Sequence, residues 1–123
     1  MKIAVSAQGP DLTSAADPHF GRAKQFVVVD TETGAVAQAV DNAQNVNAAR
    51  GAGVQAAQTV AELGVEAVIS GNCGPNAFRT LSAADIKVFT GASGTVADAV
   101  EQFKAGTLTA ADDATVQGGW GLT

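Results

Sequence analysis

Short apolar runs alternate with polar, glycine-rich stretches along the chain. Five of these runs have the length and the valine-rich composition of strands, and we predict strands at residues 3–7, 26–31, 35–41, 67–70 and 86–89. A short turn with a glycine joins the second run to the third, so these two segments form a hairpin. The fourth run is short and mostly apolar, which is typical of a strand inside a parallel sheet.

Three other segments have helical periodicity. Apolar side chains recur at three- and four-residue spacing over residues 52–64, which end in a glycine. Pro75 occupies a position that is favoured in the first turn of a second helix. Thr95 and Asp98 resemble a capping box for the last helix, which ends at Gly106. The predicted order is therefore βββαβαβα.

This order predicts one α/β domain over residues 1–106. A hairpin followed by right-handed crossovers gives a five-stranded mixed sheet of order 3-2-1-4-5, with strand two antiparallel to strand one and helices on both faces. Residues 107–123 have no clear period, and we expect them to form a flexible C-terminal tail.

Composition narrows the function classes. The net charge of the 123-residue chain is -5, so its surface as a whole repels nucleic acid and anionic membranes, and we expect neither as a partner. No apolar run is long enough to span a bilayer, and the first residues do not resemble a signal peptide. A single cysteine excludes an internal disulfide, so we expect a cytoplasmic location.

The predicted topology gathers four loops at one edge of the sheet. Loops 8–21, 42–51, 71–74 and 90–94 all lie at the carboxyl ends of the parallel strands, where open α/β sheets bind ligands. Three of the helices begin there, near Gly51, Gly74 and Gly94, and direct N–H groups at the same space. The three arginines, the only histidine and the only cysteine lie in or beside these loops: Arg22, Arg50, Arg79, His19 and Cys73. This distribution predicts an anion site on an acidic protein.

Cys73 has two opposed interpretations. A thiol at a helix N-terminus has a lowered pKa, so it could ligate a soft metal or act as a nucleophile. Alternatively, it is an incidental small apolar residue in a tight turn. Its spacing to Arg79 matches the C-x5-R pattern of cysteine-dependent phosphatases and arsenate reductases, in which a thiolate attacks and the arginine holds the oxyanion.

His19 and Trp120 also leave alternatives open. His19 is a candidate for ligand contact or direct metal ligation, or it only holds its loop in place. Together with Cys73 it supplies too few ligands for a closed zinc site. Trp120 in the tail could fold over the loops as a lid or serve as a packing anchor.

Three segments resemble a known family. The sequences His19-Phe20-Gly21-Arg22-Ala23, Gly51-Ala52-Gly53-Val54-Gln55-Ala56-Ala57 and Gly71-Asn72-Cys73-Gly74-Pro75-Asn76-Ala77 look like those of dinitrogenase iron–molybdenum cofactor-binding domains. The resemblance covers roughly residues 1–105. It implies a ribonuclease H-like, three-layer fold.

The resemblance also implies a ligand. The chain looks most like members that carry a molybdenum–copper sulfide cluster of the S2MoS2CuS2MoS2 type, an anion held without a covalent bond. Arginines, amide donors and an apolar wall would suit such an anion. The residues that the resemblance assigns to the cluster are His19, Phe20, Gly21, Arg22, Arg50, Gly51, Asn72, Cys73, Gly74 and Pro75. Cys73 and His19 are the candidates for direct contact with metal.

Three functions follow as hypotheses. The first is non-catalytic carriage or storage of the metal–sulfur cluster. The second is a thiol enzyme that acts on phosphate or arsenate through Cys73 and Arg79. The third is a metal-free module that binds a protein partner.

Overall fold

The computed structural model describes residues 1–17, 19–21, 23–42, 52–70, 73 and 75–111. Within this part of the chain the strands and helices follow the predicted order, with one strand added at the end. In chain order the elements are β1 (Lys2–Ala7), β2 (Gln25–Asp30), β3 (Val36–Asp41), α2 (Ala52–Ala61), β4 (Ala67–Ile69), α3 (Pro75–Ala83), β5 (Lys87–Thr90), α4 (Val96–Ala105) and β6 (Thr109–Ala110).

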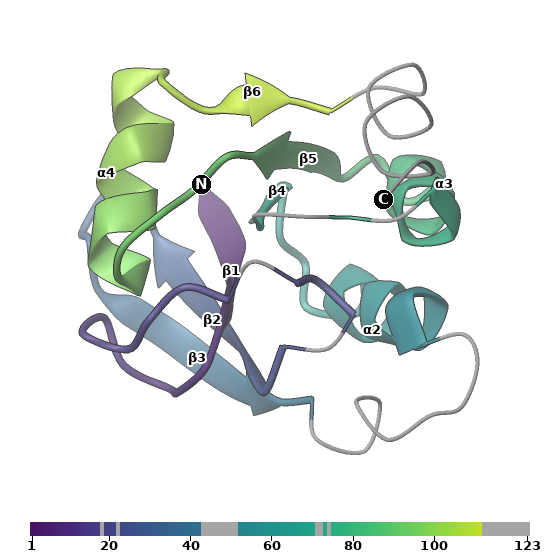
Figure 1. Cartoon of the computed structure of the whole chain (residues 1–123), viewed down its shortest axis with the longest axis horizontal. Coiled ribbons are helices and arrows are strands. Elements are labelled where there is room, and N and C mark those ends of the chain that lie inside the picture. The colour runs from purple at the N-terminus through teal and green to yellow at the C-terminus, as the bar shows by residue number, and fades with distance from the viewer. Residues whose placement is uncertain (18, 22, 43–51, 71–72, 74, 112–123) are drawn as a thin grey trace.

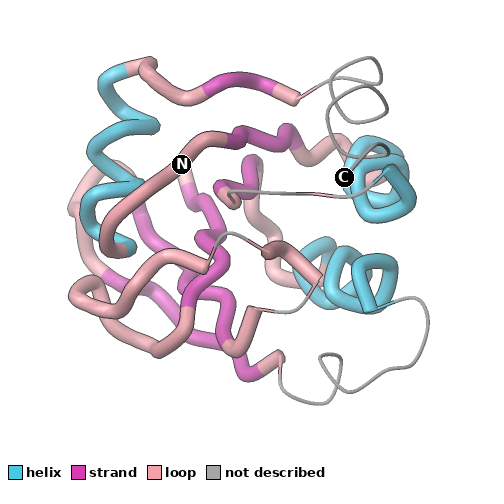
Figure 2. The backbone as a smooth tube through the Cα atoms, in the orientation of Figure 1, coloured by secondary structure: helices cyan, strands magenta, loops and turns pink. Residues whose placement is uncertain are grey.

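A single mixed sheet forms the centre of the protein (Figure 2). Its strand order is β3-β2-β1-β4-β5-β6. Strand β1 pairs antiparallel with β2 and parallel with β4, and β4 pairs parallel with β5. The predicted 3-2-1-4-5 order and the antiparallel second strand are therefore confirmed.

The sixth strand corrects the predicted strand count. Strand β6 pairs antiparallel with β5, with Phe89 opposite Ala110 and Thr90 opposite Thr109. It comes from the segment that we predicted as a tail. The strand has only two residues, and both are exposed. Its sequence therefore lacks the alternation of apolar and polar residues that predicts a strand.

Helices cover both faces of the sheet, as predicted (Figure 1). On one face, α2 and α3 pack on Ala4, Val28 and Val68. On the other face, α4 packs on a separate cluster that includes Val5 and Ile69. Since neighbouring residues of a strand point to opposite faces, each central strand contributes to both clusters.

The helix boundaries have local causes. The Thr95 hydroxyl accepts from the backbone N–H of Asp98, and the Asp98 carboxylate accepts from that of Thr95, so the predicted capping box is confirmed. Gly106 ends α4 in the left-handed conformation, with φ 75°. Helix α2 ends at Ala61, before the predicted residue 64. The backbone N–H of Leu63 donates to the carbonyl of Val60, three residues earlier, so the last turn is tighter than an α-helical turn. None of the helices in the described ranges is long and apolar enough to cross a membrane.

Candidate functional site

The candidate site lies at the carboxyl ends of β1 and β4. Helix α3 follows β4 and begins at this edge, and the loop after β1 crosses the same edge (Figure 1). Of the predicted site residues, the structure describes His19, Phe20, Gly21, Cys73 and Pro75. The other predicted site residues lie outside the described part of the chain: Arg22, Arg50, Gly51, Asn72 and Gly74.

Phe20 and Cys73 lie in the same buried cluster. Each is only 1% exposed, although 53 residues separate them in the sequence. The Phe20 ring packs against the Phe26 ring at a centroid distance of 5.1 Å, and Ala77 of α3 belongs to the same cluster. The fold therefore joins two of the predicted segments through an apolar floor beneath the edge of the sheet.

The Cys73 thiol is a neutral group in this position. Desolvation by burial raises its pKa from 9.0 to about 12. A helix N-terminus lowers the pKa of a thiol that faces it from a polar setting, whereas Cys73 lies in an apolar one. Of the two interpretations of Cys73, the buried apolar residue agrees with the structure, and an activated nucleophile does not.

His19 projects outward from the floor. Its side chain is 64% exposed, and its Nδ1 lies 3.5 Å from Oδ1 of Asp17. The same Asp17 oxygen accepts from the backbone N–H of His19 at 2.9 Å. The imidazole is thus tethered at its base and open to solvent, a position from which it can contact a ligand.

A buried hydroxyl network holds this loop on the sheet, and the sequence reasoning missed it. Ser6 of β1 is fully buried, and its Oγ lies 2.8 Å from the Asp17 carbonyl oxygen and 3.0 Å from Ser70 Oγ. The backbone N–H of Asp17 donates to the Ser6 carbonyl at 2.8 Å. The sequence feature that could have predicted this network is a pair of serines, Ser6 and Ser70, each at or next to the carboxyl end of an otherwise apolar strand.

Asn42 ties the connection after β3 to the segment before β2. It is fully buried, and its Nδ2 donates to the Ala23 carbonyl at 2.7 Å and to the Gly21 carbonyl at 3.4 Å. Its backbone N–H donates to the Lys24 carbonyl. The amide thereby fixes the backbone on either side of residue 22 relative to the point where the 42–51 loop begins.

The N-terminus of α4 does not offer amides to a ligand, which corrects our expectation for this helix. The loop after β1 covers it. Val96 N–H donates to the Ser14 carbonyl and Ala97 N–H to the Leu12 carbonyl, each at 2.9 Å. With the capping box occupied as well, these amides have protein partners.

Arg79 leans toward the first turn of α3. Its Nη1 donates to the Asn76 side-chain oxygen at 3.3 Å, and the side chain is on the exposed side of the helix. The guanidinium is therefore drawn back toward the carboxyl edge of the sheet. Nowhere in the described ranges, this edge included, do three His, Cys, Asp or Glu side chains come together as a metal site.

Replacing Ser6 by alanine is expected to lower the free energy of unfolding by about 1–3 kcal/mol, because the buried Asp17 carbonyl and Ser70 hydroxyl each lose a partner. Urea denaturation at neutral pH measures this loss. The matched control is Ser82→Ala, which removes an exposed hydroxyl from α3 and should change stability by less than about 0.5 kcal/mol. Equal stability of the two variants would show that the network contributes nothing.

Known proteins of similar sequence and structure cover most of the chain. The sequence profile of the dinitrogenase iron-molybdenum cofactor family matches residues 1–106. An uncharacterized protein of Methanocaldococcus jannaschii is 30% identical over 110 residues, which are 88% of this chain and 89% of the relative.

Two solved structures extend the comparison. The apo form of the orange protein from Desulfovibrio gigas is 44% identical, with a TM-score of 0.85 over 89% of this chain and 92% of that one. A Thermotoga protein of the DUF35 family is 38% identical, with a TM-score of 0.76 over 89% of this chain and 91% of that one. Since the family profile spans nearly the whole described fold, the chain belongs to the dinitrogenase iron-molybdenum cofactor family.

Proposed function

We propose that this protein is a non-catalytic carrier or storage protein for an anionic molybdenum–copper sulfide cluster. The cluster is bound without a covalent bond at the carboxyl edge of the sheet. The observation that carries the proposal is the apolar floor of Phe20 and Cys73 beside the start of α3. The family and the similarity to the orange protein support a cluster as the ligand.

The described residues suit a preassembled cluster better than a bare metal ion. A metal ion needs several ionised or imidazole ligands, whereas Cys73 is a buried, neutral thiol and the exposed His19 has only the Asp17 carboxylate beside it. A sulfide-rich anion presents polarisable, weakly hydrated atoms, which can rest on an aromatic ring and a neutral thiol. The negative charge of the anion then needs hydrogen-bond donors and positive charges around this apolar floor.

Donors are available around this floor. The first turn of α3 has backbone N–H groups without partners inside the helix, and the Arg79 side chain leans toward it. His19 supplies an exposed imidazole. We place the other contacts on the residues that the family resemblance assigns and that lie outside the described part: Arg22, Arg50, Gly51, Asn72 and Gly74.

The alternative of a thiol-dependent phosphatase or arsenate reductase has less support. Such an enzyme needs a thiolate at neutral pH, and burial raises the pKa of Cys73 to about 12. In addition, Pro75 removes one backbone N–H from the turn that would hold the oxyanion.

Reconstitution tests the function. Apo-protein mixed with tetrathiomolybdate and copper should give a coloured species that stays with the protein through gel filtration. Arg22→Ala and Arg50→Ala should each weaken its binding roughly tenfold or more, because each removes a charge-assisted contact to the anion. Absorbance titration of the apo-protein measures the affinity.

Lys104→Ala is the matched control for the arginine variants. It removes one positive charge from the last turn of α4, at the opposite edge of the sheet from the site. After correction for the change in net charge, Lys104→Ala should bind the cluster with the same affinity as the unmodified protein. Failure to retain colour, or equal weakening by all three substitutions, would contradict the proposed site.

The Cys73→Ala variant tests whether the thiol only packs against the cluster or coordinates one of its metal ions. If the thiol is only part of the floor, the variant keeps the colour and the metal content. Complete loss of metal in a folded variant would instead mean that Cys73 ligates the cluster.

Two broader expectations accompany this proposal. The order of the five central strands and the helices on both faces support a ribonuclease H-like classification of the fold. A cytoplasmic location stays a prediction that rests on the single cysteine.

A further inference from the structure

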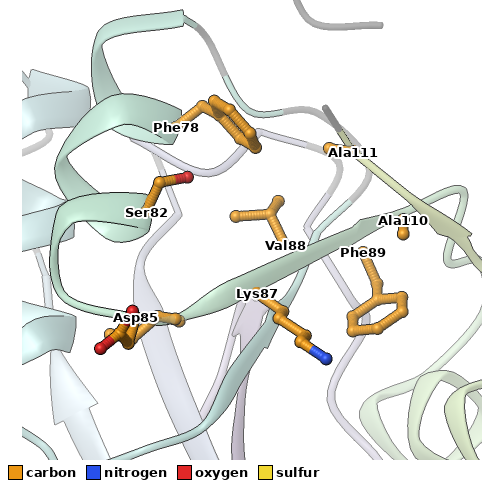
Figure 3. Close-up of a pocket in the computed structure, with 9 residues that line it drawn as sticks. Phe78, Ser82, Asp85, Lys87, Val88, Phe89, Ala110 and Ala111 are labelled. Atoms are coloured by element: carbon orange, nitrogen blue, oxygen red, sulfur yellow. The ribbon is translucent and has the colours of Figure 1, made fainter. Parts of the chain in front are cut away.

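A groove of about 460 Å³ lies between α3 and the β5–β6 edge of the sheet (Figure 3). Phe78 and Ser82 of α3 point into the same space as Val88 of β5, and Ala111 lies on the far side. Val88 is buried and Phe78 is half-buried, so the base of the groove is apolar. Its volume falls within the range of about 300–1,000 Å³ that is usual for pockets that enclose a small ligand or a large side chain.

The chain itself enters this groove as it leaves β6. The backbone N–H of Ala111 donates to the Val88 carbonyl at 2.8 Å, one residue beyond the end of the strand. The register pairs Phe89 with Ala110. The described part of the chain therefore ends beside the groove, and two acidic residues come next in the sequence.

The twelve residues that follow Ala111 contain suitable side chains for the groove. They carry two acidic residues at their start and three large apolar residues farther along, namely Val116, Trp120 and Leu122. Trp120 is nine residues beyond Ala111, a stretch that can span up to about 30 Å when extended. Its side chain can therefore reach any point in the groove.

We propose that the C-terminal segment, residues 112–123, docks in this groove, with Trp120 seated between α3 and Val88. The occupant is the chain's own segment because its covalent attachment at the rim gives it a high effective concentration there. Phe78 offers an aromatic wall to the indole. Docking covers the apolar base of the groove.

Intrinsic fluorescence of the full-length apo-protein tests this proposal. Trp120 is the only tryptophan, and the chain has no tyrosine, so the emission reports on Trp120 alone. We expect a blue-shifted emission maximum relative to the unfolded chain, and severalfold protection from acrylamide quenching. An emission maximum and quenching equal to those of the unfolded chain would overturn the proposal.

Two variants locate the buried indole. Ser82→Glu places a charge in the groove from an exposed position of α3, and Phe78→Ala removes the aromatic wall of the groove. Each should shift the emission to the red and increase quenching. Ala83→Glu is the matched control, since it adds the same charge to an exposed position of the same helix that does not line the groove. Equal effects of Ser82→Glu and Ala83→Glu would overturn the proposal.

Other occupants give different results. A blue shift that disappears on dilution would place the indole in a second copy of the chain and overturn docking within one chain. A blue shift that is insensitive to Ser82→Glu and Phe78→Ala would place the indole elsewhere on the protein and overturn the proposal. Nuclear Overhauser contacts between the Trp120 indole and the Phe78 ring would support the proposal directly, whatever the stability of the variants.

Discussion

Replacing Phe20 by alanine is expected to lower the free energy of unfolding by about 3–5 kcal/mol, because the deleted ring is fully buried and leaves a cavity. The ring packs on Phe26 at 5.1 Å and belongs to the same cluster as Cys73. A domain of this size has a total stability of about 5–15 kcal/mol. The substitution should therefore remove a large share of it, and urea denaturation measures the loss.

Phe103→Ala is the matched control for this substitution. Phe103 also packs on an aromatic ring at 5.1 Å, that of Phe89, but it is only half-buried and lies in the last turns of α4. We expect a smaller loss of stability and no change in the binding of the cluster. Phe20→Ala should weaken binding even at temperatures where the variant stays folded, because the floor of the site is missing. A Phe20→Ala variant of unchanged stability would contradict the buried position of this ring.

The Cys73 thiol is expected to react with iodoacetamide at neutral pH on the order of 10³ times more slowly than an unfolded cysteine, because a pKa shift from 9.0 to about 12 lowers the thiolate fraction by that factor. Restricted access to the buried sulfur slows the reaction further. Mass spectrometry of timed samples measures the rate, with the urea-unfolded chain as the reference. Rapid labelling of the folded apo-protein would contradict the neutral thiol and revive the enzyme hypothesis.

The same group makes stability depend on pH in a definite direction. The folded state keeps the Cys73 proton to a higher pH than the unfolded state, so this stabilising contribution is complete below pH 9 and is lost as the pH rises toward 12. The loss should approach roughly 2–4 kcal/mol at the upper end of this range. Urea midpoints at pH 7 to 11 for the protein and for Cys73→Ala isolate the contribution. If the urea midpoints of the protein and of Cys73→Ala change in parallel with pH, Cys73 is not the source of this pH dependence.

Local pattern was sufficient for most of the fold. Apolar runs identified strands β1 to β5 and their order along the chain, because strand length and alternation are properties of neighbouring residues. The cap at Thr95 and the stop at Gly106 were also predicted, since each depends on side chains or backbone within one turn. The topology then brought residues 19–21 and Cys73 to one edge of the sheet, as expected.

Tertiary packing decided what these residues can do. Cys73 at a helix start suggested a lowered pKa, but its burial comes from a cluster whose members, Phe20 among them, are mostly distant in sequence. The N-terminus of α4 suggested free amides, but carbonyl groups of the loop after β1 accept hydrogen bonds from the N–H groups of Val96 and Ala97. The Ser6 network and strand β6 likewise consist of contacts between remote segments. The sequence alone thus predicted, through local periodicity, which loops gather at one edge of the sheet. Only the folded contacts decided whether the Cys73 thiol is charged and which amides of α4 have protein partners.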